Sequence, residues 1–292
     1  MLINVYTLDR KSPMGFGDFI RGCIACHQLS LKNEFPFDIN LKRFSKFYKS
    51  EETLLKKSIY TKLFPKCLDI NELKEKLDSL AQGTNLNDTD FFILTNAWPK
   101  NTIEKQKTIE GKIKQKGWGK ISKETKDFIK SRLIPSDFQL SFIKNVPEKY
   151  EVVHIRAGDG IAFKNEVNDE SLNAHDSSDV SLDSITKATI SRISKILKTA
   201  KNPLVILSDS AEVKNNIGIQ YSKCIDNGKI IISNVDTKHS GVNGLKETFH
   251  DLTILNNAKT IHQLSVYNWG SGFSNIAHHI YDVPIKRYPK LK

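Results

Sequence analysis

The sequence predicts an α/β fold built from two Rossmann-like halves, and three observations lead to that prediction. The chain has 292 residues, which is long for one hydrophobic core, so two domains of roughly 100 to 200 residues each are expected. An N-terminal strand leads through a glycine-containing loop into a helix, and after about residue 146 apolar strands alternate with amphipathic helices. We therefore expect domains at residues 1–145 and 146–292, facing a central cleft.

The first strand is expected at residues 2–6. The loop after it contains Gly15 and Gly17, and the helix that follows carries Cys23 and Cys26 at helical spacing. This strand, loop and helix form the first unit of the N-terminal half.

The remainder of the first half is less regular. Residues 41–80 are rich in lysine and are expected to be helical, whereas residues 91–95 form an apolar run typical of a strand. The polar stretch 98–140 is expected to be helical in part, with glycines and a proline as breaks.

The second half shows the alternation that specifies a parallel sheet with covering helices. Helices are expected around 185–197, with Asp179 or Ser181 as N-cap, and around 245–255. The polar stretch 160–179 is either a lid or an ordinary surface loop. Strands are expected at 151–156, 204–208, 229–233 and 260–264.

Charged and polar residues follow three of these strands. His154 and Arg156 end one strand, Asp209 follows the next, and a Gly/Ser turn opens the last helix. The carboxyl ends of parallel strands meet at one edge of a sheet, so these groups are expected to share a crevice. Two alternatives stay open: Arg156 forms a structural Arg–Asp pair, and Asp209 is an N-cap for the helix that starts near residue 211.

Together these groups are suited to a nucleoside diphosphate. Arginine offers a planar fork of donors to phosphate oxygens, and the start of a helix offers backbone N–H groups and a favourable dipole. Asp209 and His154 could accept hydrogen bonds from the base or ribose. The turn that opens the last helix consists of Ser271, Gly272, Phe273 and Ser274.

Three peptides resemble those of one enzyme family. Residues 154–159, His-Ile-Arg-Ala-Gly-Asp, resemble the His-x-Arg-Arg/x-Gly/Thr-Asp peptide of the fucosyltransferase superfamily, which includes α1,2-, α1,6- and protein O-fucosyltransferases. Residues 15–22 resemble its N-terminal glycine loop, notably in nodulation-type enzymes. Residues 249–255 together with 271–274 are similar to its closing peptide, Asp-x-x-x-Leu followed by Ser-x-Phe-Ser/Thr.

The resemblance implies a GT-B fold, with the acceptor in the N-terminal domain and a nucleotide sugar, GDP-fucose in most relatives, in the C-terminal domain. It implies transfer with inversion and without a metal ion. Arg156 would neutralise the β-phosphate, His154 and Asp209 would contact the nucleoside, and the turn at 271–274 would wrap the diphosphate. Gly15 and Gly17 would belong to the same donor site.

One departure from the family pattern changes the expected site. Ala157 stands where many relatives carry a second arginine, so Arg21 is a candidate to assist Arg156. The base that deprotonates the acceptor is expected to be Asp18 or Asp159. No prosthetic group is expected.

Two further motifs are not assigned to metal binding. The D-x-D peptide at residues 88–90 precedes a strand, whereas metal-dependent glycosyltransferases carry it after one, so turn chemistry explains it better. Cys23 and Cys26 have zinc or redox spacing but no second ligand pair, so packing inside the helix is expected.

The sequence therefore predicts a glycosyltransferase that moves a sugar, with fucose as the expected one, to a glycan, and two alternatives remain. One is the same fold with another donor, such as UDP-xylose or GDP-rhamnose. The other is a non-catalytic nucleotide or nucleic-acid binding protein, which the net charge of +11 permits, although no dense arginine stripe supports nucleic acid.

The expected setting is the cytoplasm of a bacterium, or of a host cell for a viral chain. No charged leader followed by a long apolar run is seen at the N-terminus, and no apolar run is long enough to cross a membrane. The four cysteines are too few for a disulfide framework, which fits a reducing compartment. The oligomeric state is left open.

Overall fold

The structure is a computed structural model, and its described residues form two compact units, each with its own parallel sheet. The first unit comprises Met1–Lys107, Ile113–Phe138 and His279–Tyr281, and the rest of the chain forms the second. The assignment of acceptor and donor domains to residues 1–145 and 146–292 stays a prediction. The described residues are 2–5, 16–34, 36–41, 57–60, 75, 79, 89–93, 106–107, 113–114, 118, 120–141, 143–158, 181–233, 242–268 and 270–291.

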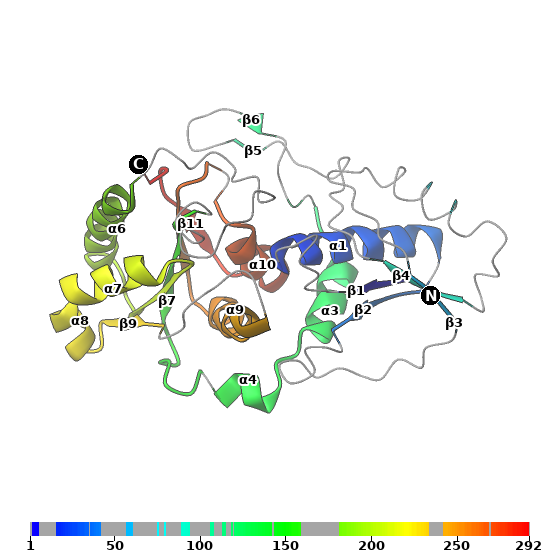
Figure 1. Ribbon diagram of the computed structural model, residues 1–292, viewed down its shortest axis with the longest axis horizontal. Coiled ribbons are helices and arrows are strands. Elements are labelled where there is room, and N and C mark those ends of the chain that lie inside the picture. Colours follow the sequence, from blue (N-terminus) through cyan, green and yellow to red (C-terminus); the bar gives the residue numbers. More distant parts are fainter. Residues whose placement is uncertain are drawn as a thin grey trace. The chain divides into compact units, whose positions relative to one another are not determined.

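In the first unit, four parallel strands lie in the order β2-β1-β4-β3. Helix α1 contacts β1, β2 and α3 (Figure 1). It buries Phe19, Ile20, Cys23 and Cys26 completely. Ser122 caps α3 by accepting a hydrogen bond from the backbone N–H of Thr125. The elements are β1 (Leu2–Val5), α1 (Phe16–Asn33), β2 (Phe37–Asn40), β3 (Lys57–Tyr60), β4 (Thr89–Ile93), a small antiparallel pair β5 (Gln106–Lys107) and β6 (Ile113–Lys114), and α3 (Lys123–Arg132).

The second unit contains five parallel strands in the order β11-β10-β7-β8-β9. Serine side chains cap α6, α7 and α10 at their N-termini. The strands are β7 (Glu151–Arg156), β8 (Leu204–Ser208), β9 (Ile230–Ile232), β10 (Ile261–Ser265) and β11 (Ile285–Arg287). The helices are α6 (Leu182–Leu197), α7 (Ala211–Gln220), α8 (Ser222–Asp226), α9 (Val242–Asn256) and α10 (Gly272–Tyr281), of which His279–Tyr281 are counted with the first unit. The short helix α4 (Asp137–Ser141) precedes this sheet in the chain.

The two faces of the central strand β7 have different surroundings. Val153 and Ile155 are fully buried in a core cluster that also contains residues of α6 and α7. Side chains alternate along a strand, so His154 and Arg156 belong to the opposite face. In Figure 1, α6 and α7 lie on one side of β7, and α9 and α10 lie on the other. The polar residues of β7 therefore face the side where α10 begins.

Several expectations about the elements are confirmed. Strands β7 and β8 match the expected ranges at both ends, and α6 begins after the expected cap Ser181. The stretches expected to be strands near residues 2, 230 and 261 and the helices near 245 and 276 are also present. The α/β class follows directly from these elements.

Other expectations are wrong. Helix α1 begins at Phe16, so Gly17 and Asp18 lie in its first turn and not in a loop, because buried packing outweighs the roughly 1 kcal/mol helix cost of a glycine. Within the lysine-rich stretch 41–80, residues 57–60 form strand β3, since pairing with β4 overrides the local pattern. Strands β2 and β11 were not expected, because runs this short carry little periodicity.

Candidate functional site

The second sheet has a topological switch point at β7. From β7 the chain moves to β8 and β9 on one side, and it then crosses to β10 and β11 on the other. In open α/β sheets, ligands bind beyond the carboxyl ends of the strands at such a point. The candidate ligand-binding residues are therefore those at or just after the ends of β7, β8 and β10.

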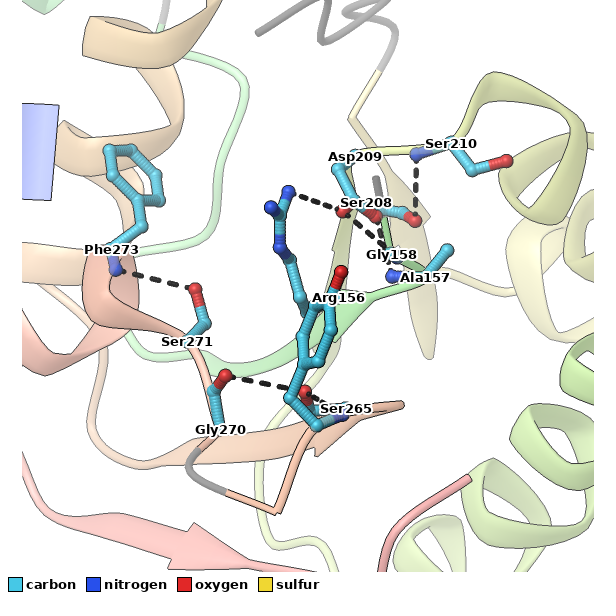
Figure 2. A network of polar contacts seen from close by, with 11 residues as sticks. Arg156, Ala157, Gly158, Ser208, Asp209, Ser210, Ser265, Gly270, Ser271 and Phe273 are labelled. Atoms are coloured by element: carbon cyan, nitrogen blue, oxygen red, sulfur yellow. Dashed lines mark hydrogen bonds and ion pairs between the residues drawn. The ribbon is translucent and has the colours of Figure 1, made fainter. Parts of the chain in front are cut away.

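Arg156, the last residue of β7, is held by Asp209, which follows β8. The guanidinium Nη1 lies 2.7 Å from Asp209 Oδ2 (Figure 2). Asp209 Oδ1 accepts a hydrogen bond from the backbone N–H of Ala157 at 2.7 Å, and Oδ2 accepts a longer one of 3.4 Å from the N–H of Gly158. Arg156 thus forms an ion pair with Asp209. The Arg–Asp pair considered within the strand-end peptide itself would use Asp159, which lies outside the described residues.

Exposure divides this pair into an accessible and an inaccessible member. The Arg156 side chain is 18% exposed, whereas that of Asp209 is 2% exposed. The helix N-cap that Asp209 was considered for is instead Ser210, whose hydroxyl accepts from the backbone N–H of Val213. Asp209 is occupied with the end of β7 and does not cap α7.

The turn after β10 is closed by its own hydrogen bonds. The N–H of Tyr267 donates to Ser265 Oγ at 2.9 Å, and that hydroxyl donates to the carbonyl of Gly270 at 3.3 Å. The N–H of Val266 donates to the Arg156 carbonyl at 3.1 Å, which fastens the turn to the end of β7. The guanidinium carbon of Arg156 lies 5.8 Å from the centroid of the Tyr267 ring, within the range of a cation–π contact.

Helix α10 starts directly after this turn. The hydroxyl of Ser271 caps it by accepting from the backbone N–H of Phe273 at 3.3 Å (Figure 2). A Cβ atom added to Gly272 would meet nothing within 4 Å, so the space beside the first residue of the helix is open. The end of β7 and the start of α10 therefore both contribute to the carboxyl edge of the sheet.

Not every residue of the Gly/Ser turn can reach a ligand with its side chain. Ser274 is fully buried, and its hydroxyl accepts a hydrogen bond of 2.6 Å from Gln263 Nε2. The same amide nitrogen lies 3.3 Å from the carbonyl of Ser271, to which it donates. His154 is 6% exposed, and its ring lies 6.0 Å from that of Phe273, centroid to centroid.

In the first unit, Asp18 and Arg21 form an ion pair with each other in α1. The guanidinium of Arg21 also lies over the ring of Trp118, 5.9 Å from its centroid, and that ring is stacked on His279. Gly17 is buried in the same turn of the helix. The other expected site residues, Gly15 and Asp159, and the expected lid at 160–179 lie outside the described residues.

Cys23 and Cys26 are buried and free, as the packing interpretation expected. Burial raises the pKa of both thiols well above the ordinary value, so they stay protonated and poorly reactive. In the described part of the chain, no group of three His, Cys, Asp or Glu side chains is arranged to hold a metal ion. Among the same residues, each helix is too short or too polar to cross a bilayer.

Sequence reasoning missed three residues of this site. Gln263 carried a usable signal, because a glutamine inside an apolar strand of a parallel sheet needs buried partners. Ser210 also carried one, as a serine three residues before Val213 at the start of a helix. Tyr267 had no comparable signal, since an aromatic residue after a strand usually belongs to the core.

No protein-family profile and no curated protein matches the sequence. Several solved structures are similar in fold, and two of them are fucosyltransferases. The crystal structure of the α-1,6-fucosyltransferase NodZ soaked with GDP-fucose has a TM-score of 0.53 and 11% identity, over 99% of this chain and 94% of that one. A structure of the fucosyltransferase NodZ from Bradyrhizobium has a TM-score of 0.51 and 10% identity, over 98% and 94%. The chain therefore has a fucosyltransferase-like α/β fold of GT-B type, which confirms the fold expected from the short motifs.

Proposed function

We propose that this protein is a glycosyltransferase that uses a nucleoside diphosphate sugar, with GDP-fucose as the donor and a glycan as the acceptor. The observation that carries the proposal is the position of Arg156 at the switch point of the second sheet, at the same carboxyl edge as the open start of α10. The likeness in fold to a fucosyltransferase whose crystal was soaked with GDP-fucose supports the choice of donor.

In this proposal Arg156 and the backbone N–H groups of α10 bind the diphosphate. A guanidinium carries five N–H donors, so the bond from Arg156 Nη1 to Asp209 is compatible with contacts to phosphate oxygens. The positive end of the α10 dipole adds to this attraction. Fixed positive charge of this kind stabilises the negative charge that develops on the diphosphate as it leaves. Arg21 is proposed to assist.

The transfer is proposed to invert the anomeric carbon and to need no metal ion. The acceptor oxygen forms a bond to the anomeric carbon while the bond from that carbon to the β-phosphate oxygen breaks. The bonding electrons leave with GDP, and the proton of the acceptor hydroxyl passes to a carboxylate. Asp18 and Asp159 are the proposed candidates for this base, and the Asp18 side chain is 37% exposed.

The first experiment is a thermal-shift measurement with GDP, UDP, CDP and their sugar conjugates in EDTA, because a ligand that binds the native state raises Tm. Stabilisation by GDP and GDP-fucose is expected. A preference for UDP-sugars would retain the fold and replace the donor. No response to any nucleotide, with salt-dependent binding of arbitrary oligonucleotides, would favour the nucleic-acid binding alternative that the charge of +11 permits.

A further inference from the structure

Asp209 was expected to contact the nucleoside, but its surroundings leave it no access to a ligand. Its side chain is 2% exposed, and both oxygens already accept hydrogen bonds. The three donors are the guanidinium of Arg156 and the backbone N–H groups of Ala157 and Gly158, all at the end of β7. The Asp209 carboxylate therefore holds the end of β7 and the Arg156 side chain in place.

Arg156 is supported on a second side by Tyr267. Tyr267 is 6% exposed, and the centroid of its ring lies 5.8 Å from the guanidinium carbon. The turn that carries it is fixed by the hydrogen bond from the N–H of Tyr267 to Ser265, the residue paired with Arg156 in the sheet register. The Arg156 side chain is therefore held by the Asp209 carboxylate, which follows β8, and by the Tyr267 ring in the turn after β10.

We propose that Asp209 and Tyr267 are positioning residues that act on the diphosphate through Arg156, and that neither contacts the nucleoside. The proposal rests on the function proposed above. A long, rotamer-rich arginine loses much conformational freedom when it binds an anion, and a charge-assisted bond plus a ring contact remove that freedom in advance. The side chain then loses its conformational entropy when the protein folds and not when the diphosphate binds.

The test compares the affinities of GDP and GMP, measured by calorimetry, because only GDP carries the β-phosphate assigned to Arg156. The variants Arg156→Ala, Asp209→Asn and Tyr267→Leu are each expected to weaken GDP binding about ten-fold or more and to leave GMP binding nearly unchanged. Tyr267→Phe keeps the ring and should bind both nucleotides as the unmodified protein does.

The double variant Arg156→Ala with Asp209→Asn measures whether Asp209 works through Arg156. Two residues that act as one unit give non-additive losses, so the double variant should bind GDP as Arg156→Ala does alone. An additive loss would overturn the proposal, as would an equal loss of GDP and GMP affinity in Asp209→Asn, which would mean contact with the nucleoside.

A matched control exists in the first unit. Asp38 also accepts a backbone N–H, that of Ile39, and pairs with an arginine, Arg132, at 2.6 Å. Asp38→Asn breaks an equivalent pair and should leave the GDP to GMP ratio unchanged. If Asp209→Asn is too unstable to measure, Tyr267→Leu still tests whether Arg156 needs to be positioned, because this variant leaves the buried Asp209 carboxylate paired. An unchanged ratio in Tyr267→Leu would then overturn the proposal.

Different results would reject the proposed function and the proposed positioning role. An unchanged GDP to GMP ratio in Arg156→Ala would reject the assignment of Arg156 to the diphosphate. A changed ratio in Arg156→Ala with an unchanged ratio in Asp209→Asn and Tyr267→Leu would keep the function and reject the positioning role.

Discussion

Gln263 and Gly270 lie so close together that no side chain fits between them. A Cβ atom on Gly270 would lie 2.0 Å from Gln263 Oε1. Gly270 also has a φ of +76°, a backbone conformation that residues other than glycine rarely adopt. Gln263 is itself fixed by its bonds to Ser271 and Ser274. The turn before α10 therefore depends on this glycine.

Gly270→Ala should destabilise the fold by about 2–5 kcal/mol, from the left-handed backbone and from the loss of the Gln263 hydrogen bonds. Chemical unfolding measures this value. Gly228→Ala is the matched control, because Gly228 also has a positive φ, +72°, but a Cβ there meets nothing within 4 Å. The control should cost only about 1–2 kcal/mol. Equal losses in the two variants would contradict the role of the Gln263 contact.

Gly272→Ala should separate stability from binding. A Cβ on Gly272 meets nothing within 4 Å, and alanine is a better helix former, so the free energy of unfolding should stay the same or rise by about 0.5 kcal/mol. If phosphate binds at the start of α10, the added methyl group should weaken GDP binding. Unfolding curves and calorimetry on one sample would show both effects, and undiminished GDP affinity would place the phosphate elsewhere.

Arg156→Lys should lose most of the transfer activity although it keeps the charge. A lysine ammonium lacks the planar fork of donors and stacks less well on an aromatic ring such as that of Tyr267. We expect kcat/KM for GDP-fucose to fall at least about ten-fold, with Tm close to that of the unmodified protein. Near-normal activity would show that only the charge at this position matters.

A buried network at the start of the second sheet should make stability depend on pH. His262 Nε2 lies 2.8 Å from Glu151 Oε2, and Nδ1 lies 2.8 Å from the Tyr288 hydroxyl. Burial lowers the pKa of His262 more than Glu151 raises it, so the imidazole is neutral. Burial would raise the pKa of Glu151, but hydrogen bonds from His262, the Lys201 N–H and Asn202 lower it overall.

Both groups bind protons more readily when unfolded, so both stabilise the fold less as the pH falls. The contribution of His262 is complete above its ordinary pKa of 6.5 and declines below it, and that of Glu151 declines below 4.5. Unfolding free energies measured from pH 7.5 to pH 4 should therefore decrease. His262→Gln, which can donate and accept in the same places, should flatten the curve between pH 6.5 and pH 5, and an unchanged slope would exclude His262 as its source.

The Tyr288 hydroxyl is expected to donate to His262, because burial raises its pKa and keeps it protonated. Tyr288→Phe would leave a buried imidazole nitrogen without its partner, at a cost of about 1–3 kcal/mol. The same change at Tyr150, whose hydroxyl donates to the Ile254 carbonyl, provides a comparison within the unit. A loss in Tyr150→Phe but none in Tyr288→Phe would contradict the network.

How far the sequence could predict this structure varies with the type of signal. Strand β7 was predictable to the residue, because an apolar run ends abruptly at Arg156, and the meeting of Arg156 with Asp209 followed from their places after neighbouring parallel strands. The role of Asp209 was not predictable, since its partners are backbone N–H groups that only the folded turn brings together. The start of α1 was placed too late for a similar reason: the packing that tolerates Gly17 in a helix is tertiary.

The strand order also affects how this protein is made. β7 pairs on one side with β8, which follows after about 50 residues, but on the other side with β10, which is more than 100 residues away in the chain. During synthesis, β7 must wait with one edge uncovered until β10 leaves the ribosome, and an uncovered apolar strand is prone to aggregate. Slow refolding and a need for chaperones are the expected result, because pairings this distant in sequence form late.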